Sequence, residues 1–177
     1  MIDRMFNRLI ITINSVVIRA ISLLNGSWIS LGATLHVHYR GRLLIGKGVR
    51  VAKNSVLSIL PGGILELKDG SIVGHGVTIF CANRIIVGAE CRIAHNCSLV
   101  DHDYDINSTA SWGNRKKISS PIIIGNNVWL GAHVIMLKGV SVGDRCVIGA
   151  QCLVLKSIPR GMVAYSYGKG ELKHKEL

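Results

Sequence analysis

Aliphatic residues recur every six positions through the last third of this 177-residue chain. The interval holds without interruption over six of them: Ile124, Leu130, Met136, Val142, Ile148 and Val154. A period of six fits neither an α-helix nor a simple strand alternation. Glycine follows most of these aliphatic residues, so each six-residue unit predicts a short strand and a tight turn.

The same spacing returns upstream and covers most of the chain. It appears at Ile45, Val51 and Leu57, at Leu67, Val73, Ile79 and Ile85, and after a two-residue shift at Val87, Ile93 and Leu99. Hexapeptide repeats are typical of a parallel β-helix, whose coils stack about 4.8 Å apart and bury aliphatic columns. A β-sandwich with turns every 8–12 residues is the alternative, and the strict period argues against it.

The composition indicates one domain with a large core. The chain is 49% hydrophobic, with 20 glycines and only 3 prolines. No disulfide framework or zinc site is expected, because the five cysteines are odd in number and form no CxxC pair. We predict small buried thiols instead, at Cys81, Cys91, Cys97, Cys146 and Cys152.

The segment "IIIGNNVWLGAHVIMLKGVSVGDRCVIGAQCLVLKSIP" resembles the hexapeptide-repeat acyltransferases, and more narrowly the maltose, galactoside and polysaccharide O-acetyltransferases. The resemblance extends over roughly residues 40 to 160. It implies an all-β fold, a left-handed parallel β-helix with an N-terminal helical segment and one ejected loop. It also implies a homotrimer with active sites between the prisms.

Three regions are expected along the chain. Residues 1–30 form a helical or cap segment, residues 31–163 form the β-helix with an active-site loop at 100–121, and residues 164–177 form a basic tail. The apolar pattern of residues 6–24 is interrupted too often for a good membrane span. Two interpretations stay open for it: a cap on the end coil, or an interfacial helix on an anionic bilayer.

The net charge of +11 raises the question of nucleic acid, which we do not expect as a partner. Aromatic residues make up only 5% of the chain, and no nucleic-acid-binding motif is visible. Coenzyme A or an anionic lipid-linked glycan accounts for the charge equally well. No signal peptide is evident, so we expect a cytoplasmic protein, with peripheral contact to the inner face of the membrane as the open alternative.

The interruption of the repeat predicts the position of the chemistry. Leu99 and Ile124 lie 25 positions apart, which is not a multiple of six, and the intervening residues are polar. Long loops on rigid scaffolds are often functional. This loop opens with "DHDYD", in which His102 stands between Asp101 and Asp103. An imidazole suits proton abstraction from a hydroxyl at neutral pH, and a carboxylate can orient it.

The resemblance assigns roles to individual residues. His102 matches the family's general base. The expected acyl donor is acetyl-CoA, and the positions that match donor contacts are Trp129, Ala132, Ala150 and Lys156. The backbone N–H of Ala132 matches the donor to the thioester oxygen. Weaker candidates for contacting the sugar or glycan acceptor or orienting the histidine are Asp101, Asp103, His75 and Asn83. No metal is expected.

The sequence therefore predicts an acetyltransferase acting on a sugar or glycan hydroxyl, in cell-surface polysaccharide biosynthesis. A nucleotide-sugar N-acyltransferase and a serine O-acetyltransferase are the nearest alternatives, although the latter would carry a long amino-terminal helical domain. A zinc enzyme like the γ-carbonic anhydrases needs three matched histidine ligands, which the spacing does not supply. An inert assembly solenoid is the alternative outside the enzymes.

Overall fold

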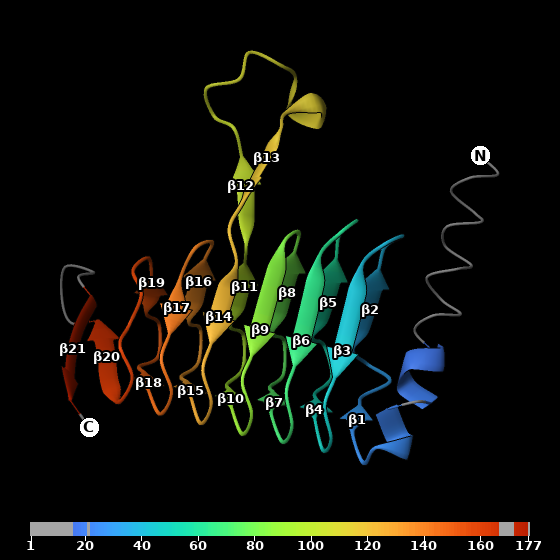
Figure 1. The fold of residues 1–177 in the computed structure, drawn as a ribbon, viewed down its shortest axis with the longest axis vertical. Coiled ribbons are helices and arrows are strands. Elements are labelled where there is room, and N and C mark those ends of the chain that lie inside the picture. The colour runs from blue at the N-terminus through green and yellow to red at the C-terminus, as the bar shows by residue number, and fades with distance from the viewer. Residues whose placement is uncertain (1–15, 21, 167–171, 177) are drawn as a thin grey trace.

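A computed structural model of the chain describes residues 16–20, 22–166 and 172–176. It is a left-handed parallel β-helix, in which about six coils stack into a three-sided prism (Figure 1). The predicted fold class is confirmed.

Each of the first five coils contributes one strand to each of three sheets, which are called A, B and C here and are parallel except for β21. Sheet A contains β1 (Trp28–Ile29), β4 (Arg50–Val51), β7 (Ile72–Val73), β10 (Arg92–Ile93), β15 (Trp129–Leu130), β18 (Val147–Ile148), β20 (Met162–Ser166) and β21 (Leu172–Glu176). Sheet B contains β2 (Thr34–Val37), β5 (Val56–Ile59), β8 (Thr78–Cys81), β11 (Ser98–Val100), β16 (Ile135–Leu137) and β19 (Leu153–Val154). Sheet C contains β3 (Arg42–Ile45), β6 (Ile64–Leu67), β9 (Arg84–Val87), β14 (Ile122–Ile124) and β17 (Ser141–Val142).

Aliphatic columns fill the prism as the repeat predicts. In sheet A, Val51 pairs with Val73 and Leu130 pairs with Ile148, and all four side chains are fully buried. Like side chains therefore stack on one another along the prism axis, which removes apolar surface from water in every coil. All five cysteines are buried and free, as predicted.

The two-residue shift in the repeat has a structural cause. Strands of sheets B and C in the early coils are four residues long and point two side chains inward, as Ile85 and Val87 do in β9. Paired residues are therefore 22 positions apart at Val51 and Val73 but 18 apart at Leu130 and Ile148. The strict hexapeptide period holds only in the shorter, later coils.

Some corners pack so closely that only glycine fits. A Cβ atom at Gly88 would lie 2.2 Å from the carbonyl oxygen of Gly125 in the next coil. This contact is with backbone, so it can be relieved only by separating two coils.

We expect Gly88→Ala to lower the free energy of unfolding by about 1–3 kcal/mol, the usual cost of overpacking. Gly113→Ala is the matched control, because a Cβ there meets nothing within 4 Å. Thermal unfolding at one protein concentration measures both variants. Equal melting temperatures for the two would contradict the packing described here.

The described part of the N-terminal segment packs on the first coil. Residues 16–20 and 22–24 are helical, Ile18 packs against the core, and Arg19 donates a hydrogen bond to the carbonyl oxygen of Ala33. These are contacts that a cap would make. Most of the predicted interfacial helix, residues 1–15, lies outside the described residues. No helix in the described ranges is long and apolar enough to cross a membrane.

The structure adds detail to two of the predicted regions. The first coil begins at β1, with Trp28, rather than at residue 31. The basic tail contains regular structure, because β20 and β21 pair in antiparallel fashion and extend sheet A beyond the last coil. Sequence periodicity could not show this hairpin, since its strands do not follow the six-residue spacing.

The interruption of the repeat is an arm that projects from the prism (Figure 1). It consists of β12 (His102–Tyr104), a short 3₁₀ helix (Trp112–Asn114) and β13 (Lys117–Ser119), with β12 and β13 antiparallel. The arm leaves the prism after β11 and returns to it before β14, so its base lies where sheet B meets sheet C.

Candidate active site

A carboxylate interrupts one of the buried columns at the base of the arm. Leu99 of β11 pairs with Ile79 of β8, and this register continues to place Asp101 beside Cys81. In the coil before, Cys81 pairs with Ile59. Asp101 therefore occupies an inward position that other coils fill with small or aliphatic residues, and it is fully buried.

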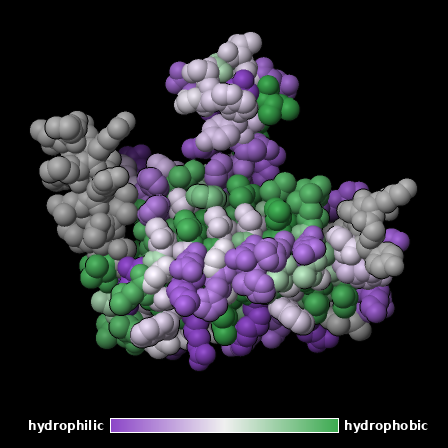
Figure 2. Space-filling model, turned by 180° about the vertical axis from the view of Figure 1, so that it is seen from behind, coloured by the Kyte–Doolittle hydropathy of each residue, from purple (hydrophilic) through white to green (hydrophobic). Residues whose placement is uncertain are grey.

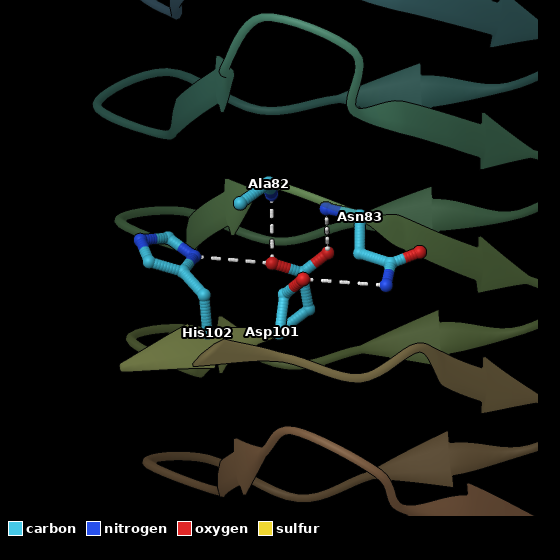
Figure 3. A network of polar contacts seen from close by, with 5 residues as sticks. Ala82, Asn83, Asp101 and His102 are labelled. Carbon is cyan, nitrogen blue, oxygen red and sulfur yellow. Dashed lines mark hydrogen bonds and ion pairs between the residues drawn. The ribbon is translucent and has the colours of Figure 1, made fainter. Parts of the chain in front are cut away.

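Both oxygens of the Asp101 carboxylate accept backbone hydrogen bonds. Oδ1 accepts the N–H of Ala82 at 2.7 Å, and Oδ2 accepts the N–H of Asn83 at 2.8 Å (Figure 3). These bonds replace the water that burial removes. Burial and the neighbouring Asp101 charge raise the pKa of the Cys81 thiol to about 12. Cys81 is thus an inert core thiol beside the carboxylate.

The same carboxylate holds the predicted base. Nδ1 of His102 lies 3.1 Å from Oδ1 of Asp101, and the imidazole side chain is 11% exposed. A buried carboxylate only accepts hydrogen bonds, so the ring proton belongs on Nδ1. Nε2 then carries the free lone pair, and Figure 3 shows that it points away from the carboxylate.

His102 opens into a groove of about 240 Å³. Its lining consists of Val100, His102, Asp103, Leu137, Lys138 and Leu155. Nζ of Lys138 lies 2.6 Å from Oδ2 of Asp103, so this ion pair forms part of the rim. Asp103 therefore pairs with a lysine and makes no hydrogen bond with the imidazole in the structure, whereas Asp101 does.

Asn83 belongs to the same cluster. Its backbone binds Asp101, and its side-chain Nδ2 donates to Oγ of Ser119 at 3.3 Å. Asn83 thus ties the end of β8 to the returning strand of the arm. Lys138 and Leu137 could not be found from the sequence, because only the register of stacked coils places the end of β16 beside the base of the arm.

The predicted donor contacts lie mainly at a different edge of sheet B. Trp129 is exposed on the outer face of β15, and Ala132 lies between β15 and β16. We call this turn the A–B corner; residues 30–33, 52–55, 74–77, 94–97, 131–134 and 149–152 form it in successive coils. Ala150 and His75 lie at the same corner. Among the described residues, no acceptor takes the N–H of Ala132 or of Ala150.

Lys156 is the exception among the donor residues. It follows β19 and lies at the edge where sheet B meets sheet C, next to Leu155 of the His102 groove. The predicted site residues therefore form two sets on opposite edges of sheet B. One prism alone does not bring His102 together with Ala132.

A larger hollow of about 580 Å³ lies along sheet C at the last coils, and none of the predicted site residues lines it. Within the described ranges, no group of three or more histidine, cysteine, aspartate or glutamate side chains is arranged to hold a metal ion.

Comparison with known proteins identifies the class and then the family. Residues 121–156 match the family described as "Bacterial transferase hexapeptide (six repeats)". The chain is 31% identical over 147 residues to the putative colanic acid biosynthesis acetyltransferase WcaF of Escherichia coli K12, covering 77% of this chain and 79% of WcaF. It is 39% identical over 103 residues to galactoside O-acetyltransferase of the same organism, covering 58% of this chain and 50% of that protein.

Solved structures share the architecture. The N-acyltransferase AntD from Bacillus cereus, in complex with dTDP and 3-hydroxybutyryl-CoA, has a TM-score of 0.71 at 17% identity, covering 85% of this chain and 79% of AntD. The polySia-specific acetyltransferase NeuO has a TM-score of 0.56 at 25% identity, covering 85% of this chain and 70% of NeuO.

These findings place the protein among the bacterial hexapeptide-repeat transferases. Within them, the chain belongs to the family of hexapeptide-repeat acetyltransferases, as the match to WcaF shows. The predicted family is therefore confirmed. The chain spans half the length of the galactoside O-acetyltransferase that it matches.

Proposed function

We propose that the protein transfers an acetyl group from acetyl-CoA to a hydroxyl of a sugar or glycan in cell-surface polysaccharide biosynthesis. The observation that carries the proposal is the Asp101–His102 pair, in which a buried carboxylate fixes Nδ1 and leaves Nε2 free at a groove. The relatives named as sugar and polysaccharide O-acetyltransferases support the same class of reaction.

The residues act in a simple sequence under this proposal. Nε2 of His102 takes the proton of the acceptor hydroxyl as its oxygen attacks the thioester carbonyl carbon. The backbone N–H of Ala132 donates to the carbonyl oxygen as negative charge develops on it. The carbon–sulfur bond then breaks, and the coenzyme thiolate takes the proton from the imidazolium. Asp101 stabilises that cation throughout, because its carboxylate lies 3.1 Å from Nδ1.

The two sets of site residues require more than one subunit in this mechanism. His102 and Ala132 lie at opposite edges of sheet B, and the outer face between them exposes Phe80, Ile135, Leu137, Leu153 and Leu155. Figure 2 shows hydrophobic surface beside the base of the arm. Such exposed apolar area favours association. We propose a homotrimer in which His102 of one subunit faces Ala132 of the next.

Mixed trimers test this arrangement. His102→Ala removes the base, and Ala132→Pro removes an N–H that has no acceptor among the described residues, so the fold loses no hydrogen bond there. Each homotrimer should be inactive. In randomly mixed trimers, about a quarter of the sites combine an intact His102 with an intact Ala132 N–H, and activity should return to that extent.

If the proline variant does not fold, Trp129→Ala replaces it in the mixture with His102→Ala. Activity no higher than the sum of the separate variants, in both mixtures, would contradict a shared site. Light scattering that gives a monomer mass at micromolar concentration would contradict the trimer itself.

The proposed reaction is tested by incubating purified protein with acetyl-CoA and a panel of sugars and lipid-linked glycans. Release of free coenzyme thiol that depends on one class of sugar acceptor supports the proposal. The failure of every sugar, with release only in the presence of serine, would favour a serine O-acetyltransferase.

A further inference from the structure

Histidines gather at the A–B corner on the N-terminal side of Ala132. His75 and His95 occupy equivalent positions in successive coils, because the carbonyl oxygen of His75 accepts the N–H of Asn96 and that of His95 accepts the N–H of His133. The rings of His95 and His133 meet edge to face, with their centroids 5.5 Å apart. Lys53 precedes His75 in the same column, since its carbonyl oxygen accepts the N–H of Gly76.

All four side chains are exposed to solvent. No side chain among the described residues accepts a hydrogen bond from any of their ring or ammonium nitrogens. A histidine ring offers at least one N–H donor in either protonation state, and a lysine offers three. The corner therefore presents a row of donors, one coil or about 4.8 Å apart.

Acidic residues are absent from this corner within the described chain. Its residues across the coils are Ser30 to Ala33, Ala52 to Ser55, Gly74 to Val77, Ala94 to Cys97, Gly131 to Val134 and Gly149 to Cys152. The corner where sheet C passes into sheet A contains Asp69, Glu90 and Asp144, together with Lys47, Lys68 and Arg145. At the A–B corner, by contrast, no carboxylate competes for the histidine and lysine donors, and this favours an anion there.

The position of Ala132 identifies which substrate would carry the anion, and this step rests on the proposed function. The donor is expected to lie along Ala132 and Ala150, which occupy one coil and the next toward the C-terminus. His95 and His75 lie one and two coils in the other direction. A substrate group that lies toward His95 and His75 from the acetyl carbonyl therefore belongs to the acceptor and not to the coenzyme.

We propose that Lys53, His75, His95 and His133 form a subsite for an anionic group of the acceptor, a carboxylate or a phosphate. The acceptor is then an acidic glycan or a phosphate-linked sugar. A neutral saccharide would offer these donors only hydroxyl oxygens, which are weaker acceptors than a charged oxygen. The subsite selects the acceptor and takes no part in the transfer of the acetyl group.

The double variant His75→Gln/His95→Gln tests the subsite by kinetics. With a galacturonic acid oligomer or a nucleoside diphosphate sugar as acceptor, KM should rise about tenfold or more, the equivalent of one charge-assisted hydrogen bond. The KM for acetyl-CoA and the kcat at saturation should stay within about twofold, as expected for lost ground-state binding. The acid oligomer and the nucleotide sugar are separate arms, which distinguish carboxylate from phosphate.

His36→Gln is the matched control, because His36 is an exposed histidine on β2, away from this corner. It should leave every constant unchanged. Equal effects of the double variant on a neutral galactose oligomer and its acidic counterpart would overturn the proposal. So would an increase confined to the KM for acetyl-CoA, which would assign the corner to the coenzyme phosphates.

A binding experiment decides the matter without catalysis. Side-chain nitrogen resonances of ¹⁵N-histidine-labelled protein are followed while galacturonic acid oligomer, nucleotide sugar or neutral oligomer is added. Shifts of His75 and His95 with one of the two anions, and none with the neutral oligomer, are expected. No shift with either anion at millimolar concentration overturns the subsite. If shifts occur but no acceptor is acetylated, the proposed reaction fails and the subsite stands.

Discussion

Replacing His102 with asparagine is expected to lower kcat by about 10²–10⁴, the usual contribution of a general base. Without the imidazole, the acceptor hydroxyl must lose its proton to water as it attacks. The affinity for acetyl-CoA should change little, because the substitution leaves the predicted donor contacts at Trp129, Ala132 and Ala150 unaltered. Coenzyme release measures the rate, and calorimetric titration measures the affinity.

Asp103→Asn is the matched control for this variant. Asp103 is the next residue on the same strand, and its carboxylate is 56% exposed and pairs only with Lys138. Exposed ion pairs contribute little to stability, and Asp103 lines the groove without a hydrogen bond to the imidazole, so kcat should fall far less than in His102→Asn. Unaltered turnover in His102→Asn would remove His102 from the mechanism.

Asp101→Asn should affect stability and catalysis together. Each carboxylate oxygen accepts a backbone N–H, and an amide can accept only one of them. Its NH₂ group would then face another N–H in a fully buried position. An unsatisfied buried donor costs about 1–3 kcal/mol in the free energy of unfolding.

The catalytic effect of Asp101→Asn follows from the ring proton of His102. If the amide NH₂ faces Nδ1, that nitrogen must become the acceptor and the proton moves to Nε2, where it blocks proton abstraction. The equivalent exchange in a serine protease triad lowers kcat about 10⁴-fold, and a loss of at least tenfold is expected here. Thermal unfolding and coenzyme release measure the two effects. Wild-type turnover in a destabilised variant would make Asp101 a purely structural residue.

The fold was predictable from the sequence because a solenoid repeats one local rule. Every coil needs an aliphatic residue at the same inward position of sheet A, which Val51, Val73 and Leu130 occupy in their coils, and a tight turn after it. The spacing of these residues alone therefore predicts stacked coils. The hand of the helix came from the family resemblance. The C-terminal hairpin was missed, because β21 pairs by an antiparallel register that no six-residue period encodes.

The candidate site was predictable only in part. His102 stands out because it follows a strand at the point where the repeat is interrupted. The inward position of Asp101 follows from strand alternation, because it lies two residues after Leu99. Its two hydrogen-bond partners, the backbone N–H groups of Ala82 and Asn83, belong to the preceding coil. Lys138 and Lys156 are placed by the register and length of later coils. Contacts between coils depend on that register, which a linear sequence does not state.

The chemical bond formed in the product distinguishes O-acetylation by His102 from the other acyl transfers. An acidic glycan is incubated with acetyl-CoA and either wild-type or His102→Asn protein, and the product is analysed by mass spectrometry before and after mild alkali. The account predicts an acetyl group that the wild-type protein adds, that alkali removes as expected for an ester, and that His102→Asn adds far more slowly. An alkali-stable amide on an amino sugar, or acetylation at the same rate by His102→Asn, would contradict it.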